Sequence, residues 1–149
     1  NTMHKVAPEI EAAIDIPLLH IADATARQLQ ADGIQRVGLL GTRFTMEQDF
    51  YKGRLQEKFG LAVLVPDEAG RERVHRIIYD ELCLGEIRAS SRAEYLAIIA
   101  GLAAAGAEAV ILGCTEIALL VGDARAAVPL YDTTAIHAEA AVALALASD

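Results

Sequence analysis

A cysteine follows a short apolar run in the second half of the chain, within the turn GCTE at residues 113–116. A helix is expected directly after this turn, so Cys114 would face the free N–H groups and partial positive charge of a helix N-terminus. Both features stabilise a thiolate and lower the pKa of a cysteine. The same N–H groups, together with the Thr115 hydroxyl, suit a carboxylate held beside the sulfur. The turn therefore predicts a reactive Cys114 next to a carboxylate-binding group.

Two kinds of chemistry fit a cysteine in this turn, nucleophilic attack and proton abstraction. A hydrolytic nucleophile needs a nearby histidine and an oxyanion hole, and no histidine is adjacent to Cys114 in the sequence. A base that removes a proton from carbon needs a thiolate, a bound substrate and an acid on the opposite face. A buried structural cysteine is the plain alternative, and it is the preferred interpretation for Cys83, which lies in a predicted helix.

The elements that would position this turn are short apolar runs in alternation with longer amphipathic segments. Because the apolar runs are continuous, they are typical of strands covered on both faces. Alternating strands and helices predict an α/β fold, a parallel sheet flanked by helices. The predicted strands are 17–21, 36–40, 61–65, 109–112 and 128–131, and the predicted helices are 4–14, 25–31 (with Asp23 as N-cap), 45–59, 71–84, 91–105 and 135–147.

Functional residues in such a sheet collect at the carboxyl ends of the strands, where loops meet helix N-termini. These positions are residues 22–25, 41–45, 66–70, 113–116 and 132–134. The Cys114 turn is therefore expected at the same edge of the sheet as the threonine-containing loop at 41–45.

The composition is that of one acidic globular chain. Its 149 residues are 54% hydrophobic and carry a formal net charge of −8, which excludes general disorder and argues against nucleic-acid or anionic-membrane partners. No apolar run reaches the roughly 18 residues of a membrane span, and no glycine motif for nucleotides is present. Two cysteines without a CxxC pair predict neither disulfides nor a metal site, which fits a cytoplasmic protein.

Residues 1–25 and 114–134 form a weak internal repeat. Each copy has a small polar cluster, a helix, an Ile-Pro-Leu or Val-Pro-Leu strand, and then aspartate with threonine. The second copy follows its own strand at 109–112, whereas the first copy begins with the chain. We interpret the repeat as a duplicated half-site whose first half is interrupted at its reactive turn.

Four segments in this order resemble the aspartate/glutamate racemase family: NTMH at 1–4, LLGTRFT at 39–45, GCTEI at 113–117 and PLYDTTAIHA at 129–138. The subgroup that the chain resembles most is that of bacterial broad-specificity amino-acid racemases. The resemblance implies a Rossmann-like sheet that forms one half of a pseudo-symmetric two-domain fold. It also implies an isomerase without pyridoxal phosphate or another cofactor, in which two cysteines remove and return the α-proton from opposite faces.

The resemblance implies roles for single residues at the strand ends. Cys114 matches the second catalytic cysteine of the family, and Thr115 would donate to the α-carboxylate of the substrate. Thr42 and Thr45 match the threonine pair of the middle loop. Glu116 falls in a motif position, either as a substrate-binding residue or as an acidic residue that favours the first turn of a helix.

The start of the chain also carries motif positions. Asn1 and Thr2 match the pair that holds the α-carboxylate and the amino group, directly after the first catalytic cysteine of the family. The position of that cysteine lies before Asn1, so we expect this chain to lack the first half-site. His4 is either a residue that surrounds the substrate site or a structural residue. His137 matches a family histidine, and we interpret it as a residue that supports the substrate-binding side chains and does not act as a base.

One segment departs from the family pattern. The sequence YDELCLG at 79–85 has Cys83 where the family has a lysine that pairs with an acidic side chain. The substrate range is therefore expected to be broader, with Arg43 or a group in the missing half-site providing the positive charge. Two further histidines have plain interpretations, His20 as a core residue of a strand and His75 as a solvated surface residue.

These features predict a racemase of aspartate, glutamate or a broader set of amino acids. Its parts would be the end of the first half-site with a returning strand at 1–24, an α/β half-domain with Cys114 at 25–134, and a C-terminal helix at 135–149. The expected partners are a small amino-acid substrate and a second copy in a homodimer. Two alternatives stay open, a single-cysteine decarboxylase or isomerase of the same superfamily and an amino-acid-binding module without catalysis.

Overall fold

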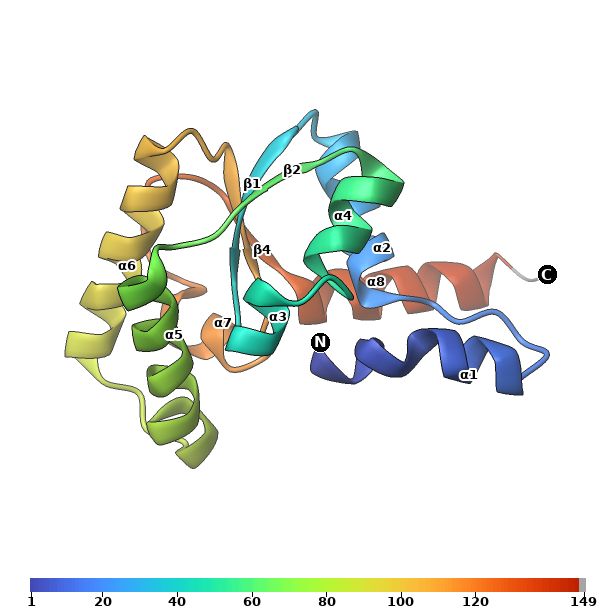
Figure 1. Ribbon diagram of the computed structural model, residues 1–149, viewed down its shortest axis with the longest axis horizontal. Coiled ribbons are helices and arrows are strands. Elements are labelled where there is room, and N and C mark those ends of the chain that lie inside the picture. The colour runs from blue at the N-terminus through green and yellow to red at the C-terminus, as the bar shows by residue number, and fades with distance from the viewer. Residues whose placement is uncertain (148–149) are drawn as a thin grey trace.

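The computed structural model describes residues 1–147, which contain one parallel sheet of four strands (Figure 1). The strands are β1 (Arg36–Leu40), β2 (Ala62–Leu64), β3 (Ala109–Leu112) and β4 (Leu130–Asp132), in the spatial order β2-β1-β3-β4. Gly38 of β1 pairs with Leu64 of β2 and Val110 of β3. Because the strands run in one direction, their carboxyl ends meet at one edge of the sheet.

Helices cover both faces of this sheet, so the predicted fold class is confirmed. In Figure 1, α5 and α6 lie to the left of the sheet and α2 and α4 to the right, while α8 packs along α2. None of the helices among residues 1–147 has the length and apolar character needed to cross a membrane. The helices are η1 (Thr2–Val6), α1 (Ala7–Ala13), α2 (Ile21–Ala31), α3 (Arg43–Glu47), α4 (Lys52–Phe59), α5 (Glu68–Asp80), η2 (Leu82–Leu84), α6 (Ala89–Ala104), α7 (Ile117–Val121) and α8 (Thr133–Leu146).

Consecutive side chains of the two central strands supply two cores on opposite faces of the sheet. Leu39 and Ile111, both fully buried, pack with α2 and α4. Leu40 and Leu112 pack on the other face with α5, α6 and α7. Burial on both faces explains why these strands are continuously apolar, and their predicted bounds at 36–40 and 109–112 are confirmed residue for residue.

The apolar run at 17–21 forms no strand, contrary to the prediction. Residues 17–20 are irregular, and α2 already begins at Ile21 with His20 as its N-cap. Asp23, the predicted cap, lies inside the first turn of the helix. An apolar run indicates burial and does not specify strand geometry, and here the buried side chains belong to a helix N-terminus.

Two predicted helices are shorter than the sequence pattern suggested. The segment 45–59 is divided into α3 and α4, with an extended Gln48 between them. The break allows Tyr51 to turn into the core, where it is fully buried, while Phe50 beside it stays half-buried. The segment 71–84 ends its α-helix at Asp80, which leaves Cys83 exposed in η2. The interpretation of Cys83 as a buried structural cysteine is therefore wrong.

Candidate active site

The loops after β1 and β3 are held against each other by glycines. The N–H of Gly113 donates to the carbonyl oxygen of Leu40 at 2.6 Å. A Cβ at Gly113 would lie 2.7 Å from that oxygen and 3.2 Å from Cγ2 of Thr45, and a Cβ at Gly41 would lie 3.1 Å from the carbonyl oxygen of Gly113. Only glycine allows so close an approach. This close approach of the two loops brings Cys114, which follows Gly113, beside the loop that carries Thr45.

The threonine pair of this loop is buried at the start of α3. The hydroxyl oxygens of Thr42 and Thr45 are 3.4 Å apart. The N–H of Arg43 donates to Nδ1 of His75 at 3.2 Å, and the His75 ring contacts two aromatic rings. His75 therefore supports this loop, and its interpretation as a solvated surface residue is wrong because the loop packs over α5.

The Arg43 side chain points to carboxylates of its own chain. Its guanidinium lies 3.4 Å from a carboxylate oxygen of Glu47 and 3.1 Å from one of Glu72. All three side chains are partly exposed to solvent, so these pairs contribute little stability. They do offset the charge that Arg43 would offer to a distal substrate carboxylate.

The first residue of the chain reaches the same edge of the sheet through a buried threonine. Nδ2 of Asn1 donates to Oγ1 of Thr133 at 3.1 Å, and this hydroxyl donates to the carbonyl oxygen of Leu112 at 2.9 Å. Leu112 ends β3 two residues before Cys114, so the hydrogen bonds tie Asn1 to the cysteine loop. Thr2 lies beside Asn1 and is half-buried. Thr133 was not assigned from the sequence, although its place after β4 marks it for inspection.

The thiol of Cys114 is half-buried and donates to Oε2 of Glu116 at 2.9 Å. The Thr115 hydroxyl donates to the same carboxylate oxygen at 2.7 Å. Burial, followed by the hydrogen bond and the negative charge of Glu116, raises the pKa of Cys114 to about 12. The predicted lowering of this pKa is wrong, because burial and the carboxylate outweigh the N-terminus of α7, a helix of five residues.

The pKa of the Glu116 carboxyl is shifted in the opposite direction to that of the Cys114 thiol. Its hydrogen bond from Cys114 and the one from Thr115 lower the pKa of the Glu116 carboxyl, although burial opposes the shift. The opposite directions of the two pKa shifts mean that the pair holds one proton, on sulfur, around neutral pH. The pair therefore carries one negative charge, on the carboxylate, and its thiol can donate a proton.

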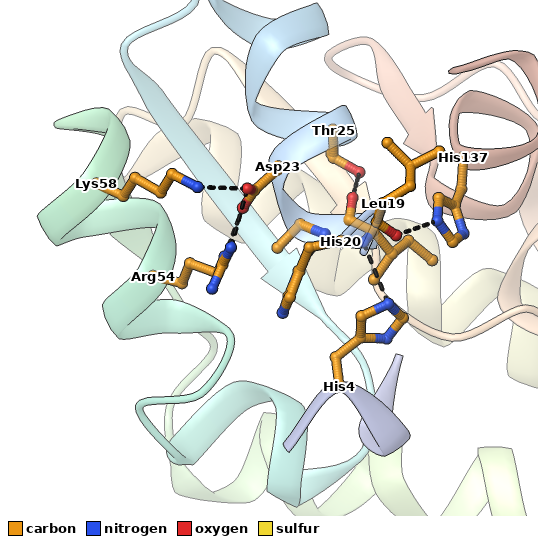
Figure 2. Close-up of polar contacts among 10 residues, drawn as sticks. His4, Leu19, His20, Asp23, Thr25, Arg54, Lys58 and His137 are labelled. Carbon is orange, nitrogen blue, oxygen red and sulfur yellow. Dashed lines mark hydrogen bonds and ion pairs between the residues drawn. The ribbon is translucent and has the colours of Figure 1, made fainter. Parts of the chain in front are cut away.

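Three histidine rings cluster where η1 meets the start of α2 (Figure 2). The ring centroids of His4 and His20 are 4.5 Å apart, and those of His4 and His137 are 5.8 Å apart. His20 is only 2% exposed, as expected for a core histidine, but it caps a helix and does not lie in a strand. Nε2 of His137 donates to the carbonyl oxygen of Leu19 at 2.8 Å.

A buried carboxylate next to this cluster was missed by the sequence analysis. Asp23 is 5% exposed and accepts from Nε of Arg54 at 2.5 Å and from Nζ of Lys58 at 2.6 Å. Although burial opposes it, these hydrogen bonds lower the pKa of Asp23 to about 2. The spacing of Arg54 and Lys58 places both cations on one face of α4, but nothing in the sequence identifies their partner on α2.

Within residues 1–147, no cluster of three or more His, Cys, Asp or Glu side chains is arranged to hold a metal ion. The polar groups that converge at the strand ends are instead a thiol, a carboxylate, hydroxyls and an amide. This set can bind a small zwitterion and move a proton.

The fold and this set of groups define an α/β protein with a cysteine at the carboxyl edge of its sheet. The family model for Asp/Glu/hydantoin racemases matches residues 1–141, and the chain therefore belongs to this family. The match includes the sheet, the Cys114 loop and the histidine cluster.

Solved structures show the same fold. A proposed Asp/Glu racemase from Yersinia pestis is 60% identical with a TM-score of 0.94, and an aspartate racemase homologue from Pyrococcus horikoshii OT3 is 35% identical with a TM-score of 0.86. These matches cover 98% and 97% of this chain, but it spans only 64% and 63% of the length of those chains. An aspartate racemase from Picrophilus torridus shares the fold at 22% sequence identity, with a TM-score of 0.62. That match covers 83% of this chain and 51% of the other chain.

Proposed function

We propose that Cys114 is one of the two acid-base groups of a racemase that acts on the α-carbon of an amino acid without a cofactor. The observation that carries the proposal is the thiol–carboxylate pair of Cys114 and Glu116 at the carboxyl edge of the sheet, in a chain of the Asp/Glu/hydantoin racemase family. Aspartate and glutamate are the first substrates to test, because the similar structures are described as aspartate or Asp/Glu racemases or their homologues.

In this proposal the proton moves between sulfur and the α-carbon. With its proton on sulfur, Cys114 donates to a carbanion-like α-carbon. In the reverse direction the thiol first releases its proton to solvent, against its raised pKa, and the thiolate then removes the α-proton. A second group exchanges a proton on the opposite face, and the family resemblance assigns it to the position before Asn1.

Fixed donors around the thiol hold the substrate in this proposal. Without a cofactor the α-proton is very weakly acidic, so donors aimed at the carboxylate must stabilise the carbanion-like transition state. In this proposal the donors are side chains of the cysteine loop, the β1 loop and the start of the chain: Thr115, Thr42, Thr45, Asn1 and Thr2. Cytoplasmic location and a homodimer remain part of the proposal.

Exchange of the α-proton with solvent tests the assignment of Cys114. The purified protein is incubated in deuterium oxide with each enantiomer of aspartate and glutamate, with a metal chelator present, and proton NMR follows the α-proton. We expect deuterium incorporation at the α-carbon, together with inversion of configuration where the group at the position before Asn1 is also present. The Cys114→Ala variant should lose at least about 100-fold in exchange rate, since a positioned acid-base group contributes that much.

Cys83→Ser is the matched control, because it removes the other thiol of the chain from an exposed position. Full exchange in Cys114→Ala, or equal losses in the two variants, contradicts the proposal. Binding of an amino acid in calorimetry without deuterium incorporation identifies the binding-module alternative. Release of carbon dioxide from the substrate identifies a decarboxylase.

A further inference from the structure

The first two N–H groups of α2 both donate to imidazole nitrogens. The N–H of Ile21 donates to Nε2 of His4 at 3.2 Å, and the N–H of Ala22 donates to Nδ1 of His20 at 3.1 Å. The first N–H groups of a helix have no partner within the helix and need outside acceptors. An imidazole nitrogen accepts only through its lone pair, so both rings must be neutral at these atoms. Protonation of either histidine replaces an acceptor with a donor.

Figure 2 shows that His4 reaches this position from another segment of the chain, below the start of α2. The His4 ring packs on the His20 ring, with 59° between their planes, and on the edge of the His137 ring. Nδ1 of His4 is buried. His4 therefore fastens η1 to the start of α2 by one hydrogen bond and one ring contact, and to α8 by a second ring contact.

The same short segment carries the proposed substrate-binding residues. The N–H of His4 donates to the carbonyl oxygen of Asn1 at 3.1 Å, and the side chain of Asn1 is bound to Thr133. Only two residues lie between Asn1 and His4, so release of the His4 ring from α2 frees the turn that positions Asn1 and Thr2. The histidine contact and the cysteine loop are thus linked through η1.

Charges of both signs surround the two rings. Burial first, and then neighbouring charges that include Arg54, lower the pKa of His4, and burial followed by the charge of Arg54 lowers the pKa of His20 to about 4. The partial positive charge of the α2 N-terminus acts in the same direction, and Asp23 opposes it at His20. The groups that face or flank the rings are Lys5 from η1, Asp23 from α2, Asp49 before α4, Arg54, Glu57 and Lys58 from α4, and His137 from α8.

We propose that His4 and His20 form a proton-sensitive clasp that fastens the Asn1–Thr2 turn to α2 when both rings are neutral and releases it when they are protonated. The predicted effect of this clasp on racemisation rests on the proposed function. His4 and His20 are positioning residues in it, because their rings act on the site through Asn1. The pocket beside them, about 330 Å³ and lined by both histidines, gives protons and water access to the rings.

The direction of the pH effect follows from the lowered pKa values. Because the folded state binds these protons less readily than the unfolded chain, the stabilisation by the clasp is complete above the ordinary histidine pKa of 6.5. It is lost as the pH falls from 6.5 toward about 4. The clasp is therefore closed at neutral pH and weakens progressively as the pH falls from 6.5 toward about 4.

Amide hydrogen exchange on the substrate-free protein tests the clasp without reference to activity. Protection factors of the N–H groups of His4, Ile21 and Ala22 are measured by NMR from pH 7.5 to pH 4.5, with the N–H of Leu29 in the same helix as an internal reference. We expect the three protection factors to fall by at least about tenfold relative to Leu29, which corresponds to one unit of pKa difference between closed and open forms.

Two conservative variants keep the acceptors and remove the titration. The amide oxygen of glutamine in His4→Gln replaces Nε2, and that of asparagine in His20→Asn replaces Nδ1, in a residue type that caps helices well. The double variant should keep its protection across the whole pH range, and its rate of racemisation should lose the acid decline of the natural protein. His4→Ala should show reduced protection at Ile21 already at pH 7.5 and a raised KM, because Asn1 is less well held.

A pH-independent protection factor in the natural protein overturns the clasp. An acid decline that persists unchanged in the double variant also overturns it, because another group then titrates. If the protection factors behave as expected but no variant and no pH gives racemisation, the clasp is supported as a structural device and the proposed function fails. The two proposals are therefore tested separately.

Discussion

The two segments that resemble each other in sequence, 1–25 and 114–134, lead into helices in different ways. In the second segment Asp132 is the N-cap of α8, where its carboxylate accepts from the N–H of Thr134 at 2.9 Å. In the first segment Asp23 lies within α2, binds Arg54 and Lys58, and leaves the cap to His20. The same residue type at matching positions therefore has a local role in one copy and a long-range role in the other.

Backbone pairing explains why the two copies diverge. Leu130–Asp132 forms β4 because it lies alongside β3, where Val110 pairs with Leu130 and the ladder takes up its polar groups. Residues 17–20 form no ladder, and the carbonyl oxygen of Leu19 accepts from His137 instead. A similar Pro-Leu run thus becomes a strand only where a neighbouring strand is available. Local sequence similarity does not fix which residue begins the next helix.

The largest expected effect comes from the glycine that precedes the second segment. Gly113→Ala places a Cβ 2.7 Å from the carbonyl oxygen of Leu40, so the backbone of β1 or of the cysteine loop must shift. We expect a loss of about 3 kcal/mol in the free energy of unfolding, measured by urea denaturation. The control is Gly101→Ala in α6, where a Cβ meets no atom within 4 Å and alanine favours the helix. Equal effects of the two changes would refute the close approach of the loops.

The next largest loss of stability is expected at Asp23, whose ion pairs have no counterpart at Asp132 in the second segment. Asp23→Asn leaves Arg54 and Lys58 without their carboxylate, and we expect a loss of about 2 kcal/mol, below that of a fully buried pair because both cations keep contact with water. The pKa of Asp23 is lowered to about 2, so this stabilisation is present above pH 3.8 and is lost as the pH falls toward 2. The variant should flatten the dependence of unfolding free energy on pH in that window. An unchanged dependence would contradict the pairing.

The thiol at the start of the second segment should react slowly with alkylating agents. At pH 8 the pKa of about 12 leaves Cys114 protonated, and it is half-buried, whereas Cys83 is exposed. Peptide mass spectrometry after iodoacetamide treatment should show Cys83 modified at least about tenfold faster. Glu116→Gln removes the charge that raises the pKa of Cys114 and should accelerate its alkylation. Slower alkylation in that variant would show that Glu116 activates the thiol at rest.

The smallest effect is expected at the cap of α8. Asp132→Ala removes the acceptor of the N–H of Thr134 and should cost about 1 kcal/mol, whereas Asp132→Asn keeps an acceptor and should be nearly neutral. Thermal unfolding of the two variants measures the difference. Asp132→Asn should therefore cost much less stability than Asp23→Asn, because asparagine replaces aspartate well as a cap and poorly as a partner of two cations. A large loss in Asp132→Asn would show that this carboxylate also has a charge-dependent role.

The hydrophobic pattern of the sequence predicted the fold well where the buried apolar residues also form a regular strand. The central strands are apolar because both faces are covered, and the predicted bounds of β1 and β3 agree with the structure. The pattern failed at 17–21 and within 45–59, where apolar residues are buried at a helix N-terminus and at a break between helices. Hydrophobicity reports that a residue is buried, but the surface that buries it belongs to other segments.

The alternation of strands and helices, the cysteine turn at the end of β3 and the motifs that resemble a racemase family can all be read from the amino-acid sequence alone. The raised pKa of Cys114, the use of His20 as a cap, the partners of Asp23 and the link from Asn1 through Thr133 to β3 depend on the folded structure. The physical reason is distance along the chain. Propensity and periodicity act between near neighbours, whereas burial, ion pairing and the linking hydrogen bonds depend on residues that only folding brings together.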